Sequence, residues 1–316
     1  MRVLLTGSTG FVGRTLLNAL RNIEIRRALR SAETTSAEES VIVGDIGAST
    51  QWAAALAGVD CVVHLAARVH VMRPTRGDGR LFRDTNVQGT QALASAAAAN
   101  GVKRFIFLSS VKVNGEATYD RPFTAADEAK PVDDYGTSKS EAETNVFEIA
   151  AKSSMEAIVI RPPLVYGPGV KANFLRLMSW VHKGIPLPLG AIRNQRSMVS
   201  VWNLCDLIKQ TIEIPSVKSG VLMVSDGEDL STPDLIRRLA VAMGRSARLV
   251  SVPESLLKVA GALTGKSAEI ARLRGSLTVD ISETKRQLGW TPPLSVDEGI
   301  ARTVRWYLNE ANARGG

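Results

Sequence analysis

Short apolar runs alternate with amphipathic stretches through the first half of the chain. Runs rich in Val, Ile, Leu and Phe occupy residues 3–5, 23–29, 41–43, 61–65, 105–108 and 158–160. Helical stretches lie between them, at residues 11–20, 52–56, 86–99 and 136–151. Strands that alternate with helices in this way pair in parallel, with helices on both faces of the sheet. The pattern therefore predicts an α/β fold, a doubly wound parallel sheet that binds ligands beyond the carboxyl ends of its strands.

The rhythm changes near Pro162. Prolines and glycines crowd together between residues 162 and 190, where they favour loops. Two helices are signalled later, by proline at the first helical position after Thr232 and by a capping box from Ser295 to Glu298. We expect residues 1–165 to form the sheet domain and residues 166–316 a smaller C-terminal α/β lobe, some segments of which return to the sheet.

Composition narrows the class of protein. The 316 residues are 45% hydrophobic, which is ample for a packed core. The chain contains no run of about 18 apolar residues, so we expect no membrane span. Met1 leads directly into the first apolar run, so we expect no signal peptide and a cytoplasmic protein. Cys61 and Cys205 are isolated, and His70 and His182 have no partners at metal-ligand spacing, so we expect neither a disulfide nor a metal site.

The net charge of +8 comes from 39 basic and 31 acidic residues. The basic residues are scattered and are not interleaved with aromatics, which argues against a nucleic-acid partner. We attribute the surplus partly to ordinary solvated surface and partly to a lining for ligands that carry phosphate.

A glycine loop follows the first predicted strand and opens the first predicted helix, with Gly7, Gly10 and Gly13 spaced three apart. Glycine permits the tight turn and lets a pyrophosphate approach the backbone, while the helix N-terminus offers free N–H groups. A structural turn is the alternative, but the position after the first strand favours a dinucleotide site of the Rossmann type. The other loop residues expected to contact the cofactor are Thr9, Phe11 and Val12.

The end of the second predicted strand bears on the choice between NAD and NADP. An acidic residue there binds the ribose hydroxyls of NAD, whereas an arginine accommodates the 2′-phosphate of NADP. Residues 26–30 read RRALR, with no acid, so Arg30 is the candidate phosphate ligand. NADP is therefore favoured and NAD remains possible. Asp45 and Ile46 follow the third strand and are placed beside the adenine, although Asp45 could equally be a turn residue.

Tyr135 and Lys139 lie one helical turn apart in the segment YGTSK. Residues at that spacing share a helix face, and a neighbouring ammonium favours the phenolate. Ser110 ends the strand at 105–108 and can bond a substrate oxygen. Alone, these residues would be a helix-start tyrosine and a solvated lysine. Together with the glycine loop they predict hydride transfer to or from a nicotinamide, with Tyr135 moving the proton and Lys139 holding the nicotinamide ribose.

These motifs resemble those of the extended short-chain dehydrogenases/reductases of the nucleotide-sugar epimerase/dehydratase type, and the resemblance covers essentially the whole chain. Further matches are HLAA at residues 64–67, NVQGT at 86–90, RPPLVYGPG at 161–169 and the segment LGW at 288–290. Asn114 departs from the pattern, because relatives usually carry tyrosine there.

The resemblance implies roles for the matched positions. It places the cofactor beside strand ends and loops that include Leu65, Ala66, Ala67, Asn86, Ser109, Pro162, Leu164 and Val165. It places the phosphates and sugar of a UDP-sugar near Arg68, Asn173, Phe174, Arg196 and Arg272, with Arg274 as the alternative to the last.

Three functions remain in view. The arginine-rich second strand favours an NADPH-dependent reductase of a UDP-4-keto-6-deoxy-N-acetylhexose, of the kind that resembles enzymes of O-antigen sugar synthesis. The alternative is a UDP-glucose or UDP-N-acetylglucosamine 4-epimerase that holds NAD tightly, and the same residues serve both reactions. A non-catalytic dinucleotide sensor is the third possibility, although it would not need the catalytic set. The resemblance also implies a homodimer formed through residues 86–99 and 136–151.

Overall fold

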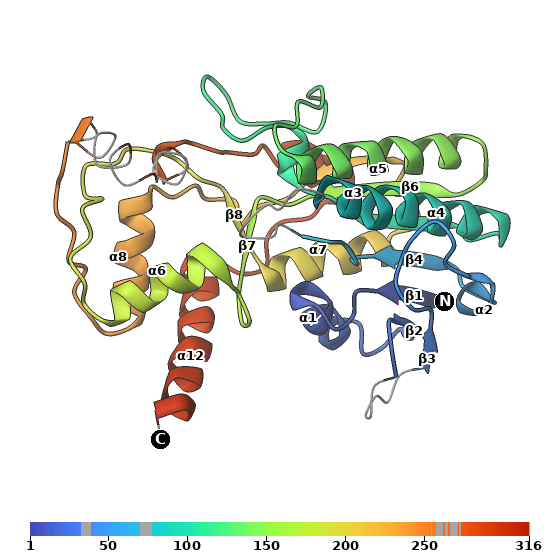
Figure 1. The fold of residues 1–316 in the computed structure, drawn as a ribbon, viewed down its shortest axis with the longest axis horizontal. Coiled ribbons are helices and arrows are strands. Elements are labelled where there is room, and N and C mark those ends of the chain that lie inside the picture. Colours follow the sequence, from blue (N-terminus) through green and yellow to red (C-terminus); the bar gives the residue numbers. More distant parts are fainter. Residues whose placement is uncertain are drawn as a thin grey trace.

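The computed structural model of the chain describes residues 1–32, 39–69, 78–253, 255–256, 262, 265, 271 and 273–315. Seven parallel strands form its central sheet, in the order β3-β2-β1-β4-β5-β6-β9 (Figure 1). Their bounds are β1 Arg2–Thr6, β2 Glu24–Leu29, β3 Glu39–Ile42, β4 Cys61–His64, β5 Arg104–Leu108, β6 Glu156–Arg161 and β9 Gly220–Met223. This is the predicted Rossmann-type doubly wound fold, and the prediction is confirmed.

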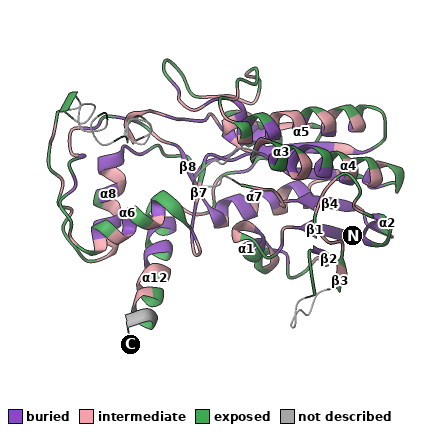
Figure 2. Ribbon diagram, in the orientation of Figure 1, coloured by how far each residue is buried: buried purple, intermediate pink, exposed green. Residues whose placement is uncertain are grey.

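Alternate residues of each strand supply opposite faces of the sheet. Val3 and Leu5 of β1 face a core shared with α1 (Phe11–Ala19), α7 (Val201–Glu213) and α11 (Ser282–Leu288). Leu4 faces the other core, with α2 (Ala53–Leu56), α4 (Thr90–Ala99) and α5 (Asp134–Ala151). Because side chains alternate along a strand, one buried strand can serve both layers of helices. The inner strands β1, β4, β5 and β6 are accordingly buried from both sides, whereas the edge strand β3 is mostly exposed (Figure 2).

A second, smaller group of elements lies beyond the carboxyl ends of the strands, at the left of Figure 1. It contains α6 (Ala172–His182), α8 (Thr232–Ala242) and α12 (Val296–Gly315), together with a separate two-stranded parallel sheet of β7 (Leu164–Tyr166) and β8 (Met198–Ser200). These elements share a core of their own around Tyr166. Phe11, at the start of α1, packs against this core and also against the core that the sheet shares with α1, α7 and α11.

The helix expected at residues 86–99 differs from the prediction. The chain forms α3 (Asp78–Phe82), then a π-helical segment, η1 (Arg83–Gly89), and only then the regular helix α4. Such segments are rare and often lie at functional sites. Gly89 explains the local path, because a Cβ there would lie 2.6 Å from Ile46 Cγ2. The π-helical segment therefore rests directly on the loop after β3.

The remaining short element is the 3-10 turn η2 (Val111–Val113), which begins just after β5. Among the described residues, no helix combines the length and the apolar character that a bilayer crossing requires.

Candidate active site

The glycine loop after β1 is shaped by close backbone approaches. Gly7 has a φ of +71°, and a Cβ on it would lie 2.7 Å from the backbone nitrogen of Ala66. A Cβ on Gly13 would lie 2.2 Å from the carbonyl oxygen of Gly7. Gly10 N donates to the same oxygen at 3.0 Å. Only glycine allows this turn to close against the end of β4.

The turn leads directly into α1, whose first N–H groups face the loop. Gly10 caps α1 without a side-chain hydrogen bond, and the first turn of the helix carries no acidic residue. Free N–H groups and the positive end of the helix dipole suit an anionic group such as a pyrophosphate. The helix starts where β1 lies between β2 and β4, the point at which the strand order reverses and such sheets bind dinucleotides. The loop therefore fits a dinucleotide.

The three arginines of the second strand each contact protein groups. Arg30, which is exposed, places its Nε 2.7 Å from Asp45 Oδ1. Arg26 is buried and pairs at 2.9 Å with the carboxylate of Glu39 on β3. Arg27 is buried and donates from Nε to Ser8 Oγ in the glycine loop at 3.1 Å. Asp45, predicted to lie beside the adenine, is thus the partner of the residue predicted to bind the 2′-phosphate.

The predicted catalytic residues meet at the carboxyl end of β5. The Ser110 hydroxyl lies close enough to the Tyr135 phenol to lower its pKa. Lys139 follows Tyr135 on the same face of α5, and its Nζ donates to the carbonyl oxygen of Leu108 at 2.7 Å. Burial and the nearby Asp133 carboxylate raise the pKa of Tyr135 to about 12, against a smaller lowering by the hydrogen bond from Ser110. Release of the phenolic proton therefore needs a cation close by.

Lys139, one helical turn along α5 from Tyr135, is almost completely buried. Its Nζ lies 4.2 Å from the centroid of the Phe107 ring. Burial lowers the pKa of Lys139 to about 7, although the carboxylate of Glu143 acts in the opposite direction. A small electrostatic change around Lys139 will therefore alter its charge near neutral pH.

Local sequence explains how the start of α5 reaches Ser110. Asp133 caps the helix by accepting from Gly136 N at 2.7 Å, and its other carboxylate oxygen lies 2.5 Å from Lys112 Nζ. Gly136 allows the approach, because a Cβ there would lie 2.8 Å from the carbonyl oxygen of Lys112. Gly136, the residue after Tyr135, thus packs against the turn that begins after Ser110.

The end of β4 is tied to α5 through Asn86. Asn86 Oδ1 accepts from Arg68 N at 2.8 Å, and Asn86 Nδ2 donates to Ser138 Oγ at 3.0 Å. This chain of bonds fixes the segment that contains Leu65, Ala66 and Ala67 relative to the catalytic helix. Within the described part of the chain, Arg68 Nε is buried without a hydrogen-bond partner. Its guanidinium is therefore a candidate for a bond to substrate.

His64, the last residue of β4, is a neutral side chain held by two hydrogen bonds. Its ring nitrogens bond the hydroxyls of Thr6 at 2.7 Å and Thr90 at 2.9 Å. Burial, with a contribution from Lys139, lowers the pKa of His64 to about 3. His64 therefore orders three elements without carrying a charge.

The segment that follows β6 also lies near Ser110. The carbonyl oxygen of Pro162 accepts from Val111 N at 2.9 Å, so Pro162 lies beside the residue that follows Ser110. Leu164 is exposed at 43%, and Val165 is half-buried. Ser109 is buried, and its hydroxyl contacts Glu143 rather than open space. Of these four predicted cofactor residues, Leu164 presents the most accessible side chain.

The predicted substrate residues fall into different environments. Asn173 is exposed at the start of α6. Phe174 is buried and stacks on Tyr166 with ring centroids 5.4 Å apart, so it anchors α6 in the core instead of offering a surface to a ligand. Arg196 donates from Nη1 to the carbonyl oxygen of Gly275 at 3.2 Å. Burial lowers the pKa of Arg196, and the Glu116 carboxylate opposes that effect. Arg272 lies outside the described residues.

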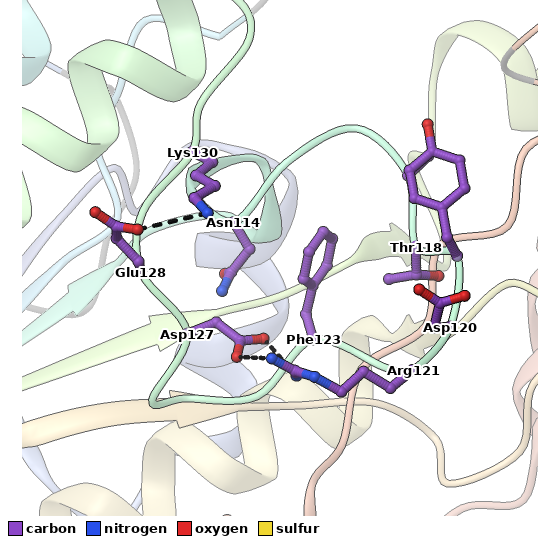
Figure 3. A pocket seen from close by; sticks show the side chains of 10 residues that line it. Asn114, Thr118, Asp120, Arg121, Phe123, Asp127, Glu128 and Lys130 are labelled. Atoms are coloured by element: carbon purple, nitrogen blue, oxygen red, sulfur yellow. Dashed lines mark hydrogen bonds and ion pairs between the residues drawn. The ribbon is translucent and has the colours of Figure 1, made fainter.

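A cavity of about 770 Å³ opens along the loop between η2 and α5 (Figure 3). Asn114 and Phe123 line it, and Arg121 crosses it to pair with Asp127 at 2.6 Å. Tyr119 also lines the cavity and is 91% exposed. The lining of the cavity does not include Ser110, Tyr135 or Lys139, so the cavity is separate from the predicted catalytic residues.

Sequence reasoning missed a buried group of residues behind the catalytic set. Glu143 and Arg161 form an ion pair at 2.5 Å, and Arg161 also donates to Asn114 Oδ1 at 3.2 Å. One signal was available: Glu143 lies one helical turn after Lys139, as Lys139 does after Tyr135.

Comparison with known proteins agrees with this geometry. The profile of the NAD dependent epimerase/dehydratase family matches residues 3–220. The chain belongs to this family of enzymes. The extended short-chain dehydrogenase/reductase resemblance inferred from its motifs is thereby confirmed.

Relatives within the family span the whole chain. A UDP-glucose 4-epimerase of Vibrio cholerae is 48% identical, covering 98% of this chain and 96% of that protein. An N-acetyl-alpha-D-glucosaminyl-diphospho-ditrans,octacis-undecaprenol 4-epimerase of Escherichia coli O157:H7 is 30% identical over the same shares. The structure of MoeE5 in complex with UDP-glucose and NAD matches with a TM-score of 0.79 at 25% identity, covering 98% of this chain and 100% of that one.

Proposed function

We propose that this chain is a 4-epimerase of UDP-hexoses that uses tightly held NAD. The observation that carries the proposal is that the Ser110 hydroxyl lies close enough to the Tyr135 phenol to act on its pKa, with Lys139 one turn along the same helix, at the sheet edge that holds the glycine loop. The choice of an epimerase over the ketoreductase that the sequence favoured rests on the 48% identical relative, which is a UDP-glucose 4-epimerase.

The site fits NAD better than NADP. The Gly7 turn and the uncapped start of α1 leave room for a pyrophosphate. Asp45, held 2.7 Å from Arg30, would place a carboxylate beside a 2′-phosphate and repel it, whereas a carboxylate can accept hydrogen bonds from ribose hydroxyls. MoeE5, a structural relative, was solved with NAD. When bound, NAD accepts hydride from C4 of the sugar and returns it.

The protein's own groups handle the proton and the geometry. Tyr135 takes the proton from the C4 hydroxyl as hydride leaves C4, and gives it back when the ketone is reduced. The ammonium of Lys139 favours the phenolate that this step requires, and also holds the nicotinamide ribose. Ser110 donates to the C4 oxygen and orients it toward Tyr135.

Inversion at C4 requires the 4-keto sugar to present either face to the same hydride donor. The UDP moiety must then be held while the sugar ring turns. Arg196, on which the Glu116 carboxylate acts, and Asn173 at the start of α6 would hold the phosphates. Arg68 follows the end of β4, and its buried Nε, which has no hydrogen-bond partner, suits a bond to the sugar.

The decisive experiment combines cofactor identification with turnover. Native mass spectrometry of the purified protein should find NAD, and NMR should show UDP-glucose converting to UDP-galactose without added cofactor. UDP-N-acetylglucosamine should be tested in parallel. Tyr135→Phe should retain NAD and lose turnover. If the protein interconverts neither sugar, but consumes NADPH with a UDP-4-keto-6-deoxy sugar, the ketoreductase alternative replaces this proposal.

A further inference from the structure

Behind the catalytic residues lies a buried ion pair that the reaction does not touch. Arg161, at the end of β6, contacts both carboxylate oxygens of Glu143 on α5, through Nε at 3.0 and 3.2 Å and through Nη2 at 2.5 Å. The two side chains are only 7% and 5% exposed. Buried ion pairs lose much hydration, and apolar replacements of similar volume are often equally stable. Stability alone therefore does not account for a pair at this position.

The pair joins three elements that carry the catalytic set. The Ser109 hydroxyl donates to Glu143 Oε1, and Ser109 N donates to the carbonyl oxygen of Ile160 at 2.8 Å. Arg161 Nη1 donates to Asn114 Oδ1 at 3.2 Å. The residue before Ser110, the residue before Pro162 and the helix that carries Tyr135 and Lys139 are thus bound to one another through Glu143.

Glu143 is also the acidic group that acts on Lys139. The groups that face Lys139 are the carbonyl oxygen of Leu108 and the ring of Phe107 from β5, His64 from β4, and Glu143 from its own helix. His64 stays neutral, because burial lowers its pKa to about 3. Asp133 acts on the phenol of Tyr135 and is itself paired with Lys112. Glu143 therefore favours the ammonium form of Lys139, against the burial that opposes it.

We propose that Glu143, fixed by Arg161, is a positioning residue that holds the Lys139 ammonium and the Ser109–Ser110 strand end in the arrangement that proton transfer through Tyr135 requires. The inference rests on the proposed function, because it assigns Lys139 and Tyr135 their roles in that reaction. Asn114, where relatives of the family usually carry tyrosine, extends the same linkage to the loop that borders the cavity.

The experiment compares Glu143→Gln with the double variant Glu143→Gln/Arg161→Met. Glu143→Gln alone leaves the buried guanidinium of Arg161 without a carboxylate partner, so we expect it to destabilise the protein. The double variant leaves no buried unpaired charge, so its thermal unfolding should return toward that of the wild type. Both variants should move the alkaline limb of the kcat profile about one pH unit toward lower pH, because Lys139 loses its proton more easily. Glu148→Gln, an exposed change of the same chemistry on the same helix, should leave the profile unchanged.

A second readout separates this inference from the proposed function. The affinity for NADH, followed by its fluorescence, should fall at a lower pH in both variants than in the wild type, whether or not the protein turns over a UDP-sugar. If the wild type turns over no UDP-sugar, the proposed function fails while this measurement still tests the role of Glu143. A double variant that folds and keeps both wild-type pH profiles would overturn the inference and leave the pair a purely structural one.

Discussion

Replacing Gly136 by alanine tests the contact that brings Tyr135 to Ser110. The new Cβ would lie 2.8 Å from the carbonyl oxygen of Lys112 and 3.2 Å from both Asp133 Oδ1 and Pro131 Cβ. The nearest of these atoms belongs to the backbone and cannot swing aside. The start of α5 must therefore move away from η2 by about half an ångström to restore an ordinary contact. That movement would carry the Tyr135 hydroxyl away from the Ser110 hydroxyl.

The expected loss follows from the sensitivity of catalysis to geometry. A misplacement of about 1 Å can cost about a hundredfold in rate, so half that shift should lower kcat about tenfold. Helix propensity favours alanine by about 0.5–1 kcal/mol, which offsets part of a clash that costs about 1–3 kcal/mol, so the variant should still fold.

The assay measures kcat for the UDP-sugar interconversion together with NAD affinity, which should change little. Gly220→Ala is the matched control, because a Cβ there meets no atom within 4 Å. A Gly136→Ala variant with the wild-type kcat would refute the reasoning, since α5 would not then depend on this close approach.

Three further predictions follow from the same structure. The His64 pKa is lowered to about 3 in the folded state, so the unfolded chain binds the extra proton below its ordinary pKa of 6.5. Stability is therefore complete above pH 6.5 and should fall by about 1.4 kcal/mol per pH unit below it, down to the folded pKa. Urea unfolding of His64→Gln should show a shallower fall, and an identical pH dependence would count against this assignment. Ala172 has a φ of +54°, in the left-handed region. Ala172→Gly should therefore raise the free energy of unfolding by up to about 1 kcal/mol, and a loss in urea titration would mean that the residue is not strained. Asp45→Asn should improve NADP binding relative to NAD by about fivefold, the worth of one charge contact in water, and an unchanged ratio of the two dissociation constants would remove Asp45 from the cofactor site.

The parts of this molecule that depend on local patterns could be predicted from sequence. Apolar runs separated by helical stretches gave the parallel sheet, because strand burial on both faces leaves a plain compositional signal. The glycine loop could also be predicted, because the turn at Gly7 has a backbone conformation that few other residues tolerate. The position of Tyr135 and Lys139 on one face of a helix could be predicted from their spacing.

Features that depend on distant partners could not be predicted. The ion pair of Arg30, the predicted phosphate ligand, with Asp45, fifteen residues later, depends on the path of the chain after β3. The stacking of Phe174, a predicted substrate residue, on Tyr166 depends on how the small lobe packs. The π-helical segment at residues 83–89 arises where Gly89 meets Ile46, a contact that helical periodicity does not encode. Each outcome was decided by tertiary packing.

The arrival of β9 at the sheet edge beside β6 has a consequence for how the enzyme is made. The edge strand, and the α7 side chains Leu204, Leu207 and Ile208 that cover one sheet face, are translated only after the start of the small lobe. When residue 165 has been added, every predicted catalytic residue has therefore been synthesised, but α7, which covers one face of the sheet, has not. A fragment that ends at residue 165 would expose the apolar side chains on that face of the sheet. We therefore expect residues 1–165 to fold stably only with the rest of the chain or with the help of a chaperone.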